Sequence, residues 1–445
     1  MKTIEQIAAE LQGYDPQALT ATGVNDFLAK LVTPLAETEA VGLFDALGRV
    51  LAADVVSPIS VPPHDNSAMD GYAFAGAQLR DDAPLILNVV GTALAGKAWA
   101  GTAGPGECVK IMTGAIMPAG LDTVVPQEFV RVEGDQVAIP PKLLRTGDNR
   151  RRLGEDLLAG RPALQEGELL TPAACGLLAS LGLKQVSVFR RLRVAYFSTG
   201  DEILSLGEAP REGAVYDSNR YTVFGLLTRL GCEVIDLGVV PDEPARLEAA
   251  FMEAAQRADA IITSGGVSVG EADYTKAMMK QLGDVAFWKI AMRPGRPMAV
   301  GRISSLKTTD DADQAGLDRS QKKSTTAHSA VLFGLPGNPV AVMVTFLAFV
   351  RPALLRMMGA RPQPQPLLRA HSAQALRKKP GRTEYQRGIV STAPDGTLQV
   401  CTTGNQGSGV LSSMVQANGL IVLHHAQGNV APGDEVDVLM FDGAI

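Results

Sequence analysis

The sequence predicts a multidomain α/β protein in which a mainly parallel α/β domain follows a small β-rich domain and precedes a C-terminal β-barrel. The chain has 445 residues, enough for about three domains at roughly 150 residues each. From about Arg193, apolar strands alternate with amphipathic helical stretches, which is typical of βαβ units. After the proline-rich segment 361–366, short apolar runs are separated by glycine turns, which is typical of a barrel or sandwich.

Five strands are predicted in the α/β domain, which is expected to span 185–358. They are 193–198, 233–240, 259–263, 285–290 and 330–334. Two of the intervening helices have clear start and stop signals. The helix at 217–230 begins with Asp-Ser and ends before Gly231, and the helix at 244–257 begins with proline in its first turn.

The remaining segments have different compositions. Residues 57–156 are rich in Gly, Pro and Val and predict a small β-rich domain. Residues 1–56 and 157–184 are expected to form an N-terminal helix and a linking domain, and residues 359–445 the barrel. The segment at about 302–328 is polar and aperiodic between two apolar strands, so it predicts a mobile insertion, with a charged regulatory element as the alternative.

The overall composition excludes several classes of protein. Apolar residues make up 46% and charged residues 20% of the chain, as in soluble globular proteins. With 41 Lys+Arg against 47 Asp+Glu, the chain has a net charge of −6. It therefore lacks the excess of basic residues that is typical of nucleic-acid-binding proteins. The four cysteines lack CxxC spacing, which favours reduced thiols over a zinc site. The longest apolar run, 340–350, is short for a membrane span, and the first residues lack a signal-peptide core. We therefore expect a cytoplasmic protein without a membrane or nucleic-acid partner.

Polar residues collect directly after the predicted strands. Ligands of open parallel sheets bind beyond the carboxyl ends of the strands. The first strand runs into 198–202, which includes Thr199 and Glu202, the second reaches Asp242, and the third runs into 264–273. In this third turn, glycines let backbone amides point into one space and hydroxyls add further donors. The turn therefore predicts a cradle for a phosphate or another oxyanion.

Acidic and basic side chains near this turn suggest a metal ion and an anion bound together. Glu202, Asp242 and Asp273 would repel an anion, so they are predicted to hold Mg²⁺, which prefers carboxylate oxygens and bridges to phosphate. Lys289 lies at the end of another predicted strand, which leads into a proline-stiffened turn that begins with Arg293. This stretch would present cations to an oxyanion, although it could be a simple turn.

Two other polar regions have a structural alternative. The turn 336–338 follows the fifth strand and offers backbone amides before a helix, although it could be a simple turn. In the small domain, 65–72 and 149–156 carry charges of both signs, which on their own indicate a solvated ion-pair network. Glycine turns and aspartate caps are common, so the gathering of several such loops at one sheet edge is what predicts a site.

Taken together, these motifs resemble the molybdopterin molybdenumtransferase family, which comprises the bacterial MoeA proteins and the gephyrin E domain. In chain order, the motifs are PPHDNSAMDGYAF, VKIMTGAIMP, NRRRLGED, FSTGDE, YDSNR, TSGGVSVGEADY and GLPGNPV. The resemblance runs from about Leu35 to the C-terminus. It implies a molybdopterin-binding α/β fold and a reaction in which molybdate is inserted into adenylylated molybdopterin and AMP leaves with the help of Mg²⁺.

The resemblance also indicates which side chains act. The expected catalytic residues are Asp70, Asp156, Glu202, Asp242, Asp273, Lys289 and Arg293, with Glu202, Asp242 and Asp273 as the metal ligands. The expected binding residues are Thr113, Thr199, Ser264, Gly265, Gly266, Ser268, Gly270, Pro336, Gly337, Asn338 and Ser408. Relatives commonly carry lysine where this chain has Arg293, and the insertion after Gly301 is longer than the hairpin usual there.

The resemblance further implies a homodimer with a shared active site. In it, Asp70, Thr113 and Asp156 of one chain would complete the site begun by the α/β domain of the other. A molybdopterin adenylyltransferase and downstream cofactor-handling proteins are the expected partners. Either a molybdate oxygen or water could attack phosphorus, so no nucleophilic side chain is needed.

Two alternative functions remain at this point. The first is a molybdopterin adenylyltransferase, a sister enzyme that is commonly a single α/β domain. The second is a non-catalytic dimeric scaffold of the gephyrin E-domain type. The extra domains argue against the first, and acids retained at five family positions argue against the second.

Overall fold

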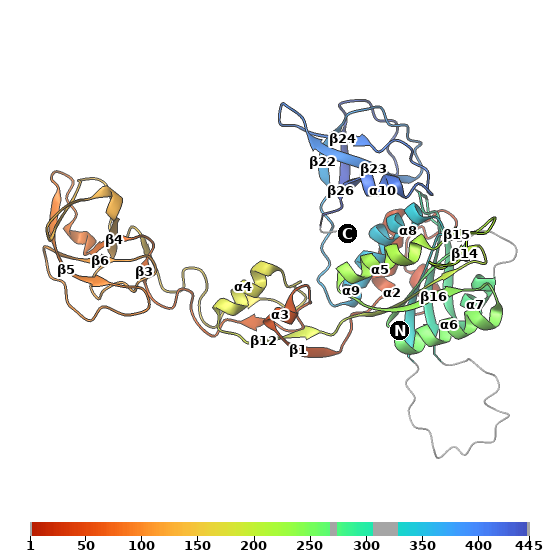
Figure 1. Ribbon diagram of the computed structural model, residues 1–445, viewed down its shortest axis with the longest axis horizontal. Coiled ribbons are helices and arrows are strands. Elements are labelled where there is room, and N and C mark those ends of the chain that lie inside the picture. Colours follow the sequence, from red (N-terminus) through yellow and green to blue (C-terminus); the bar gives the residue numbers. More distant parts are fainter. Residues whose placement is uncertain (1, 268–273, 306–327, 443–445) are drawn as a thin grey trace, which may run out of the picture.

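The computed structural model describes residues 2–267, 274–305 and 328–442. Most of the predicted insertion lies outside these residues, as do the predicted site residues Ser268, Gly270 and Asp273. The chain is strongly elongated (Figure 1). The small β-rich domain lies at one end, the linking region in the middle, and the α/β domain with the barrel beside it at the other end.

The α/β domain is built on a six-stranded sheet in the order β16-β13-β17-β21-β20-β18. The strands are β13 (Arg193–Thr199), β16 (Glu233–Val240), β17 (Ala260–Ser264), β18 (Gly283–Lys289), β20 (Pro297–Ser304) and β21 (Ser329–Leu335). The first four in the sheet order are parallel. Strand β20 is antiparallel to both of its neighbours, so β18 runs in the direction of the parallel strands. The five predicted strands are confirmed.

Helices cover both faces of this sheet and are held by two apolar clusters. Helices α5 (Ser218–Leu230), α8 (Pro339–Thr345) and α9 (Arg351–Met357) lie on one face, and α6 (Pro244–Arg257) and α7 (Tyr274–Leu282) on the other. The predicted boundaries of α5 and α6 are confirmed. Asp217 caps α5 by accepting a hydrogen bond from the Arg220 N–H at 3.0 Å, and Gly231 ends it with φ of 86°.

The N-terminal helices pack on the α/β domain. They are α1 (Ile4–Ala9) and α2 (Ala21–Leu31). The ring of Phe27 meets Trp288 edge to face with centroids 4.9 Å apart, and the Ile4 N–H donates to the Asp284 carboxylate at 2.8 Å. The linking region therefore begins after these helices.

Paired strands from distant parts of the sequence form the linking region. Strand β1 (Thr38–Gly42) pairs with β12 (Gln185–Phe189), and β2 (Val55–Val56) pairs with β11 (Pro162–Leu164), both antiparallel. Two helices, α3 (Leu43–Ala46) and α4 (Pro172–Ser180), pack beside them.

The small domain contains a mixed sheet in the order β7-β4-β6-β5-β9-β8, as expected for a β-rich domain. Its strands are β4 (Gly71–Phe74), β5 (Leu85–Ala93), β6 (Glu107–Ile111), β7 (Thr123–Pro126), β8 (Arg131–Glu133) and β9 (Gln136–Ile139). A separate pair, β3 (Asn66–Ser67) with β10 (Arg150–Arg151), joins two of the polar motifs.

The predicted C-terminal barrel is confirmed. It consists of β22 (Leu368–Ser372), β23 (Thr383–Thr392), β24 (Leu398–Thr402), β25 (Gly419–Leu423) and β26 (Glu435–Met440), and the pairing of β23 with β25 closes it. Strand β19 (Met292–Arg293) comes from the α/β domain and pairs with β23, so it joins the two domains.

One helical stretch, Pro339–Met357, is long and apolar enough to cross a membrane when judged by length and composition alone. It combines α8, a π-helical turn at Phe346–Val350 and α9. However, 67% of its most apolar window is buried inside the protein. Packing in the core of the α/β domain accounts for its apolar character.

Candidate functional site

The polar loops meet at one edge of the sheet because the parallel strands end at the same level. Ser198 is paired with Ser264, and Ser264 is paired with Leu335. The loops that leave this edge are 200–202, 241–243, 265–267 and 336–338. Lys289 ends β18 at the same edge, where it pairs with Pro297. The structure thus brings together the loops that were predicted to form a site.

Two glycines after β17 stand where the backbone conformation and the neighbouring atoms leave no room for a side chain. Gly265 has φ of +92° and Gly266 has φ of +64°, both in the left-handed region. A Cβ at Gly265 would lie 2.4 Å from the Thr199 carbonyl oxygen, and one at Gly266 would lie 2.5 Å from the Thr275 side chain. The Gly265 N–H donates to the Leu335 carbonyl at 3.2 Å, so this amide is already engaged. Any free amides of the cradle must come from other residues of the turn.

Ser264 lies in a buried cluster of hydroxyl groups beneath this turn. Its Oγ is 2.7 Å from Tyr196 Oη and 3.2 Å from Ser198 Oγ, and Tyr196 Oη is 2.9 Å from Ser198 Oγ. Burial raises the pKa of Tyr196 well above its usual range, so its hydroxyl stays protonated and available as a donor. In this arrangement the Ser264 side chain supports the turn from below.

The end of β13 places an unsatisfied hydroxyl beside an acid. Thr199 is 3% exposed, and its Oγ1 has no hydrogen-bond partner among the described residues. The Glu202 carboxylate folds back over Gly200, since a Cβ at Gly200 would lie 2.5 Å from Glu202 Oε2. A buried polar atom without a partner costs free energy, so a ligand or ordered water near Thr199 would be stabilising.

Asp242 is tied to the neighbouring loops. Its N–H donates to Asp201 Oδ1 at 3.2 Å, and its carboxylate accepts from Thr275 Oγ1 at 3.4 Å. Asp201 was not among the expected site residues, although it stands in the motif FSTGDE beside Glu202. Its contact with Asp242 connects the loops that follow β13 and β16.

The donor set at this edge suits a hard cation. In the part of the chain that the structure describes, no group of three or more His, Cys, Asp and Glu side chains is placed to hold a metal ion. Of the three expected metal ligands, Glu202 and Asp242 are described, and Asp273 lies outside the described residues. Mg²⁺ is usually held by one or two carboxylates together with substrate phosphates and water, so these residues fit it.

Positive charge gathers where the α/β domain meets the barrel. Lys289 is half-buried at the end of β18, and Arg293 is exposed in β19, opposite Glu384. Arg387 of β23 is 1% exposed. Its pKa is lowered, first by burial and second by the positive charge of Arg293.

Arg387 holds a loop of the barrel by its backbone carbonyls. Its guanidinium donates to the carbonyls of Asn405 at 3.1 Å, Gln406 at 3.2 Å and Gly407 at 2.9 Å. It also donates to Ser413 Oγ at 2.9 Å. The sequence did not single out Arg387, whose only signal is a basic residue inside an otherwise barrel-forming strand.

This loop brings the predicted residues Ser408 and Asn338 into contact. Asn338 Nδ2 donates to Ser408 Oγ at 3.1 Å, and the Val340 N–H donates to the Ser408 carbonyl at 3.1 Å. Pro336 is buried and Gly337 is exposed in the same turn. The barrel therefore borders the edge of the sheet at the turn 336–338.

The small domain forms a polar cluster of its own. Asp70 Oδ1 accepts from the Thr113 N–H at 2.6 Å and from Thr113 Oγ1 at 2.7 Å. These two hydrogen bonds, the backbone one first, lower the pKa of Asp70. Asp156 is exposed on the same domain, and its N–H donates to the Val61 carbonyl at 3.1 Å.

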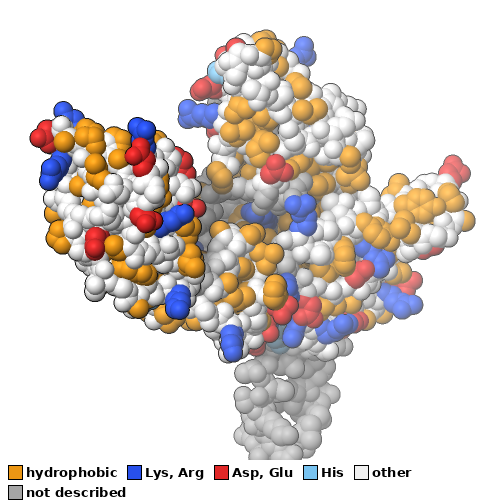
Figure 2. Space-filling view, turned by 60° about the vertical axis from the view of Figure 1, so that its left-hand side comes forward, with side chains coloured by type: hydrophobic (Ala, Val, Ile, Leu, Met, Phe, Trp, Pro, Cys, Tyr) orange, Lys and Arg blue, Asp and Glu red, His pale blue; other side chains and the backbone are white. Residues whose placement is uncertain are grey.

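Within one chain this cluster is far from the sheet edge. The linking region separates the small domain from the α/β domain (Figure 1). Figure 2 shows the small domain as a separate lobe with acidic and basic side chains interspersed on its surface. The predicted residues thus form two groups, one on each lobe.

Comparisons with known proteins match almost the whole chain. The family models of the MoeA N-terminal region (domain I and II), the probable molybdopterin binding domain and the MoeA C-terminal region (domain IV) match residues 20–182, 195–356 and 369–441. The molybdopterin molybdenumtransferase of Haemophilus influenzae is 40% identical over 407 residues, which cover 91% of this chain and 94% of that protein. The chain belongs to the molybdopterin molybdenumtransferase family.

Other members of the molybdopterin molybdenumtransferase family agree with this. The protein of that name from a Nostoc species is 35% identical over 411 residues, 91% of this chain and 88% of that protein. A crystal structure of the molybdopterin biosynthesis MoeA protein from Pyrococcus horikoshii matches with a TM-score of 0.75 at 26% identity, covering 95% of this chain and 100% of that one. The predicted multidomain fold is therefore confirmed as that of the family.

Proposed function

We propose that this chain is a transferase of molybdenum cofactor biosynthesis that inserts molybdate into adenylylated molybdopterin and releases AMP in the presence of Mg²⁺. The observation that carries the proposal is the match of all its domains to relatives named molybdopterin molybdenumtransferase, at 40% identity for the Haemophilus protein. The substrates are an oxyanion and a phosphoanhydride. Both suit an edge that combines carboxylates, hydroxyls and cations.

The residues of this edge have distinct proposed roles. Lys289 and Arg293 stabilise the negative charge that develops on the phosphate and on molybdate. Glu202 and Asp242, with Asp273 as a further expected ligand, would hold Mg²⁺, which supplies a Lewis acid for the phosphoanhydride. Thr199 offers its unpaired hydroxyl to the bound anion. The proposal needs no protein nucleophile.

The site is proposed to be completed by a second copy of the chain. Asp70 and Thr113 lie on the small domain, far from the sheet edge of the same chain. In a symmetric dimer the small domain of each chain would face the α/β domain of the other. This arrangement gives the polar cluster of the small domain a function.

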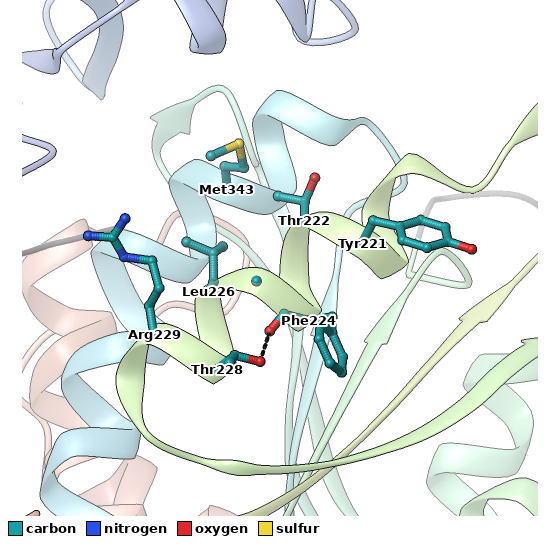
Figure 3. Close-up of a pocket in the computed structure, with 8 residues that line it drawn as sticks. Tyr221, Thr222, Phe224, Leu226, Thr228, Arg229 and Met343 are labelled. Carbon is teal, nitrogen blue, oxygen red and sulfur yellow. Dashed lines mark hydrogen bonds between the residues drawn. The ribbon is translucent and has the colours of Figure 1, made fainter. Parts of the chain in front are cut away.

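The surface of α5 offers apolar contacts for such a dimer. Tyr221 is 50% exposed and Phe224 is 45% exposed, beside a shallow groove. Figure 3 shows this groove, with Met343 of α8 near Leu226 and with Tyr221 and Phe224 projecting from α5. Exposed apolar groups that cluster in this way are typical of interaction surfaces. Because α5 begins at the sheet edge, a partner that covers this face would also reach the site.

The proposed reaction requires other proteins before and after it. An adenylyltransferase must supply adenylylated molybdopterin, and acceptor proteins must receive the finished cofactor. We place the reaction in the cytoplasm, where thiols remain reduced, because all four cysteines are free in the structure.

The two alternative functions are not favoured. A molybdopterin adenylyltransferase would account for the α/β domain alone, whereas the family match includes the small domain and the barrel. A non-catalytic scaffold would not require acids at the sheet edge. Each alternative predicts a different result when the protein is incubated with adenylylated molybdopterin, molybdate and Mg²⁺.

The decisive assay incubates the purified protein with adenylylated molybdopterin, molybdate and Mg²⁺ and follows AMP release and molybdenum incorporation. We expect both products, and we expect Glu202→Gln to lower the rate at least about a hundredfold if it removes a metal ligand. Glu233→Gln is the matched control, because Glu233 is an exposed acid at the opposite end of the sheet. ATP-dependent adenylylation of molybdopterin would instead favour the adenylyltransferase. The absence of both activities in the folded dimer would favour the scaffold.

A further inference from the structure

The turn 336–338 is held from two sides by side-chain amides. Asn219 lies in the first turn of α5 and is 8% exposed, and its Nδ2 donates to the Gly337 carbonyl at 2.7 Å. The next residue, Asn338, donates to Ser408 Oγ of the barrel at 3.1 Å. Two adjacent residues are thus tied in opposite directions, one to the α/β domain and one to the barrel.

The barrel also supplies the cap that Asn338 does not provide. Asparagine at an N-cap usually accepts a hydrogen bond from a backbone N–H of the helix. Asn338 occupies this position of α8, but its side chain makes no such bond. Instead, the Val340 N–H donates to the Ser408 carbonyl at 3.1 Å. The first turn of α8 therefore depends on where the barrel loop lies.

Side-chain packing around Gly337 does not hold this turn in place. A Cβ added at Gly337 would have no atom within 4 Å. The contact there is the hydrogen bond from Asn219. The amide of Asn219 points in only one useful direction, because the opposite orientation would set its oxygen against the Gly337 carbonyl.

Burial of the Asn219 amide costs free energy, and the hydrogen bond to Gly337 offsets only part of this cost. Its Oδ1 is buried and has no hydrogen-bond partner within the described ranges. A half-satisfied amide costs free energy compared with an apolar side chain of similar size. Asn219 belongs to the motif YDSNR, whose residues have no assigned role in the proposed reaction.

We infer that Asn219 is a positioning residue that sets the turn 336–338 and, through Asn338, the barrel loop that carries Ser408. This inference rests on the proposed function for its effect on the substrate, whereas the contact itself is independent of that function. Loss of the Asn219 contact should loosen the border between sheet edge and barrel. Binding of the substrate should then weaken, with a smaller effect on the chemical step.

The test compares Asn219→Asp and Asn219→Ala with Asn418→Asp. Asn219→Asp keeps the shape of the side chain but replaces the donor with an acceptor. Asn418 is the matched control, because its Nδ2 also donates to a backbone carbonyl, that of Val390, at 2.9 Å, but within the barrel wall. Amide hydrogen exchange is measured at 337–340 and 407–410, and KM for adenylylated molybdopterin and kcat are measured in the same preparations.

Both Asn219 variants should exchange faster at 337–340 and 407–410, and KM should rise roughly three- to tenfold, the effect of one lost hydrogen bond, while kcat changes less. Asn418→Asp should change neither the exchange at these segments nor KM. Unchanged exchange in the folded Asn219 variants would overturn the inference, as would a fall in kcat with KM unaltered. If the wild type releases no AMP, the proposed function fails, and the exchange result still decides the role of Asn219.

Discussion

At the scale of single residues, Arg387 is the largest fully buried side chain in the part of the chain that the structure describes. It is buried, and its guanidinium is satisfied by three backbone carbonyls and one hydroxyl. Hydrogen bonds from a charged donor are stronger than neutral ones, and each carbonyl left without a donor would cost free energy. Arg387 therefore determines the shape of the loop that presents Ser408.

Replacing Arg387 by lysine should destabilise the protein by about 1–3 kcal/mol, because a single ammonium cannot reach all the carbonyls that the planar guanidinium reaches. Chemical denaturation measures this change. The control is Arg369→Lys, since Arg369 is 75% exposed and its ion pair with Glu435 is on the surface. Equal free energies of unfolding for the two variants would contradict this role of Arg387.

Asp70 offers a prediction about protonation. Its pKa is lowered by Thr113, so its contribution to stability is present above the pKa of the unfolded chain and is lost as the pH falls through the folded pKa. Thr113→Val removes the hydroxyl donor and keeps the backbone N–H. The pKa of Asp70 should rise toward its ordinary value and stay below it, as measured by ¹³C NMR titration of the carboxyl group. An unchanged pKa would show that the hydroxyl makes no bond in solution.

The buried cysteines predict a loss of stability at high pH. Burial raises the pKa of Cys108 and of Cys232 to about 12. Their thiols ionise in the unfolded chain above roughly pH 8.5, so the stability they contribute is complete below that pH and is lost as the pH rises toward 12.

In the native protein at pH 8, thiol reagents should modify Cys175 and Cys401 first. Rapid labelling of Cys108 in the folded protein would contradict this prediction.

At the scale of elements, the edge of the sheet depends on the turn after β17. The left-handed backbone of Gly265 and its approach to Thr199 leave no room for a side chain. The exposed Gly337, by contrast, has open space around its Cβ position. Packing at this edge therefore requires glycine at position 265 but not at position 337.

Gly265→Ala should lower stability by more than about 1 kcal/mol, because the new Cβ meets a carbonyl oxygen and the backbone is strained. It should also abolish AMP release, since the new Cβ would displace Thr199. Gly337→Ala should fold with nearly unchanged stability. Thermal unfolding and the AMP assay check both variants, and a stable, active Gly265→Ala protein would rule out the described turn.

Much of this edge could be predicted because local signals determine it. Capping residues and prolines marked the ends of α5 and α6, and polar residues after apolar strands marked the edge itself. Strand β20 was not among the five strands predicted for this domain. Its antiparallel direction could not be predicted either, because the apolar pattern of a strand does not specify its partner. Two further contacts join residues that are distant in the sequence and could not be predicted. They are the hydrogen bond between Ser264 and Tyr196 and the hydrogen bonds from Arg387 to the carbonyls of residues 405–407. The motif resemblance indicated the site residues without showing these contacts.

At the scale of the whole molecule, the elongated shape separates the two groups of site residues. The small domain carries Asp70 and Thr113, and the α/β domain carries Glu202 and Asp242, with the linking region between them. We propose that a second copy of the chain brings the two groups together, so that the shared site inserts molybdate and releases AMP.

The most direct test is a heterodimer of an Asp70→Asn chain and a Glu202→Gln chain, purified with two different tags and assayed for AMP release and molybdenum incorporation. Each variant alone should be almost inactive. If the site is shared, one of the two sites in the heterodimer has both halves intact, and about half of the wild-type activity should return. A heterodimer as inactive as the two parent variants would contradict the shared site, because every site would then lie within a single, damaged chain.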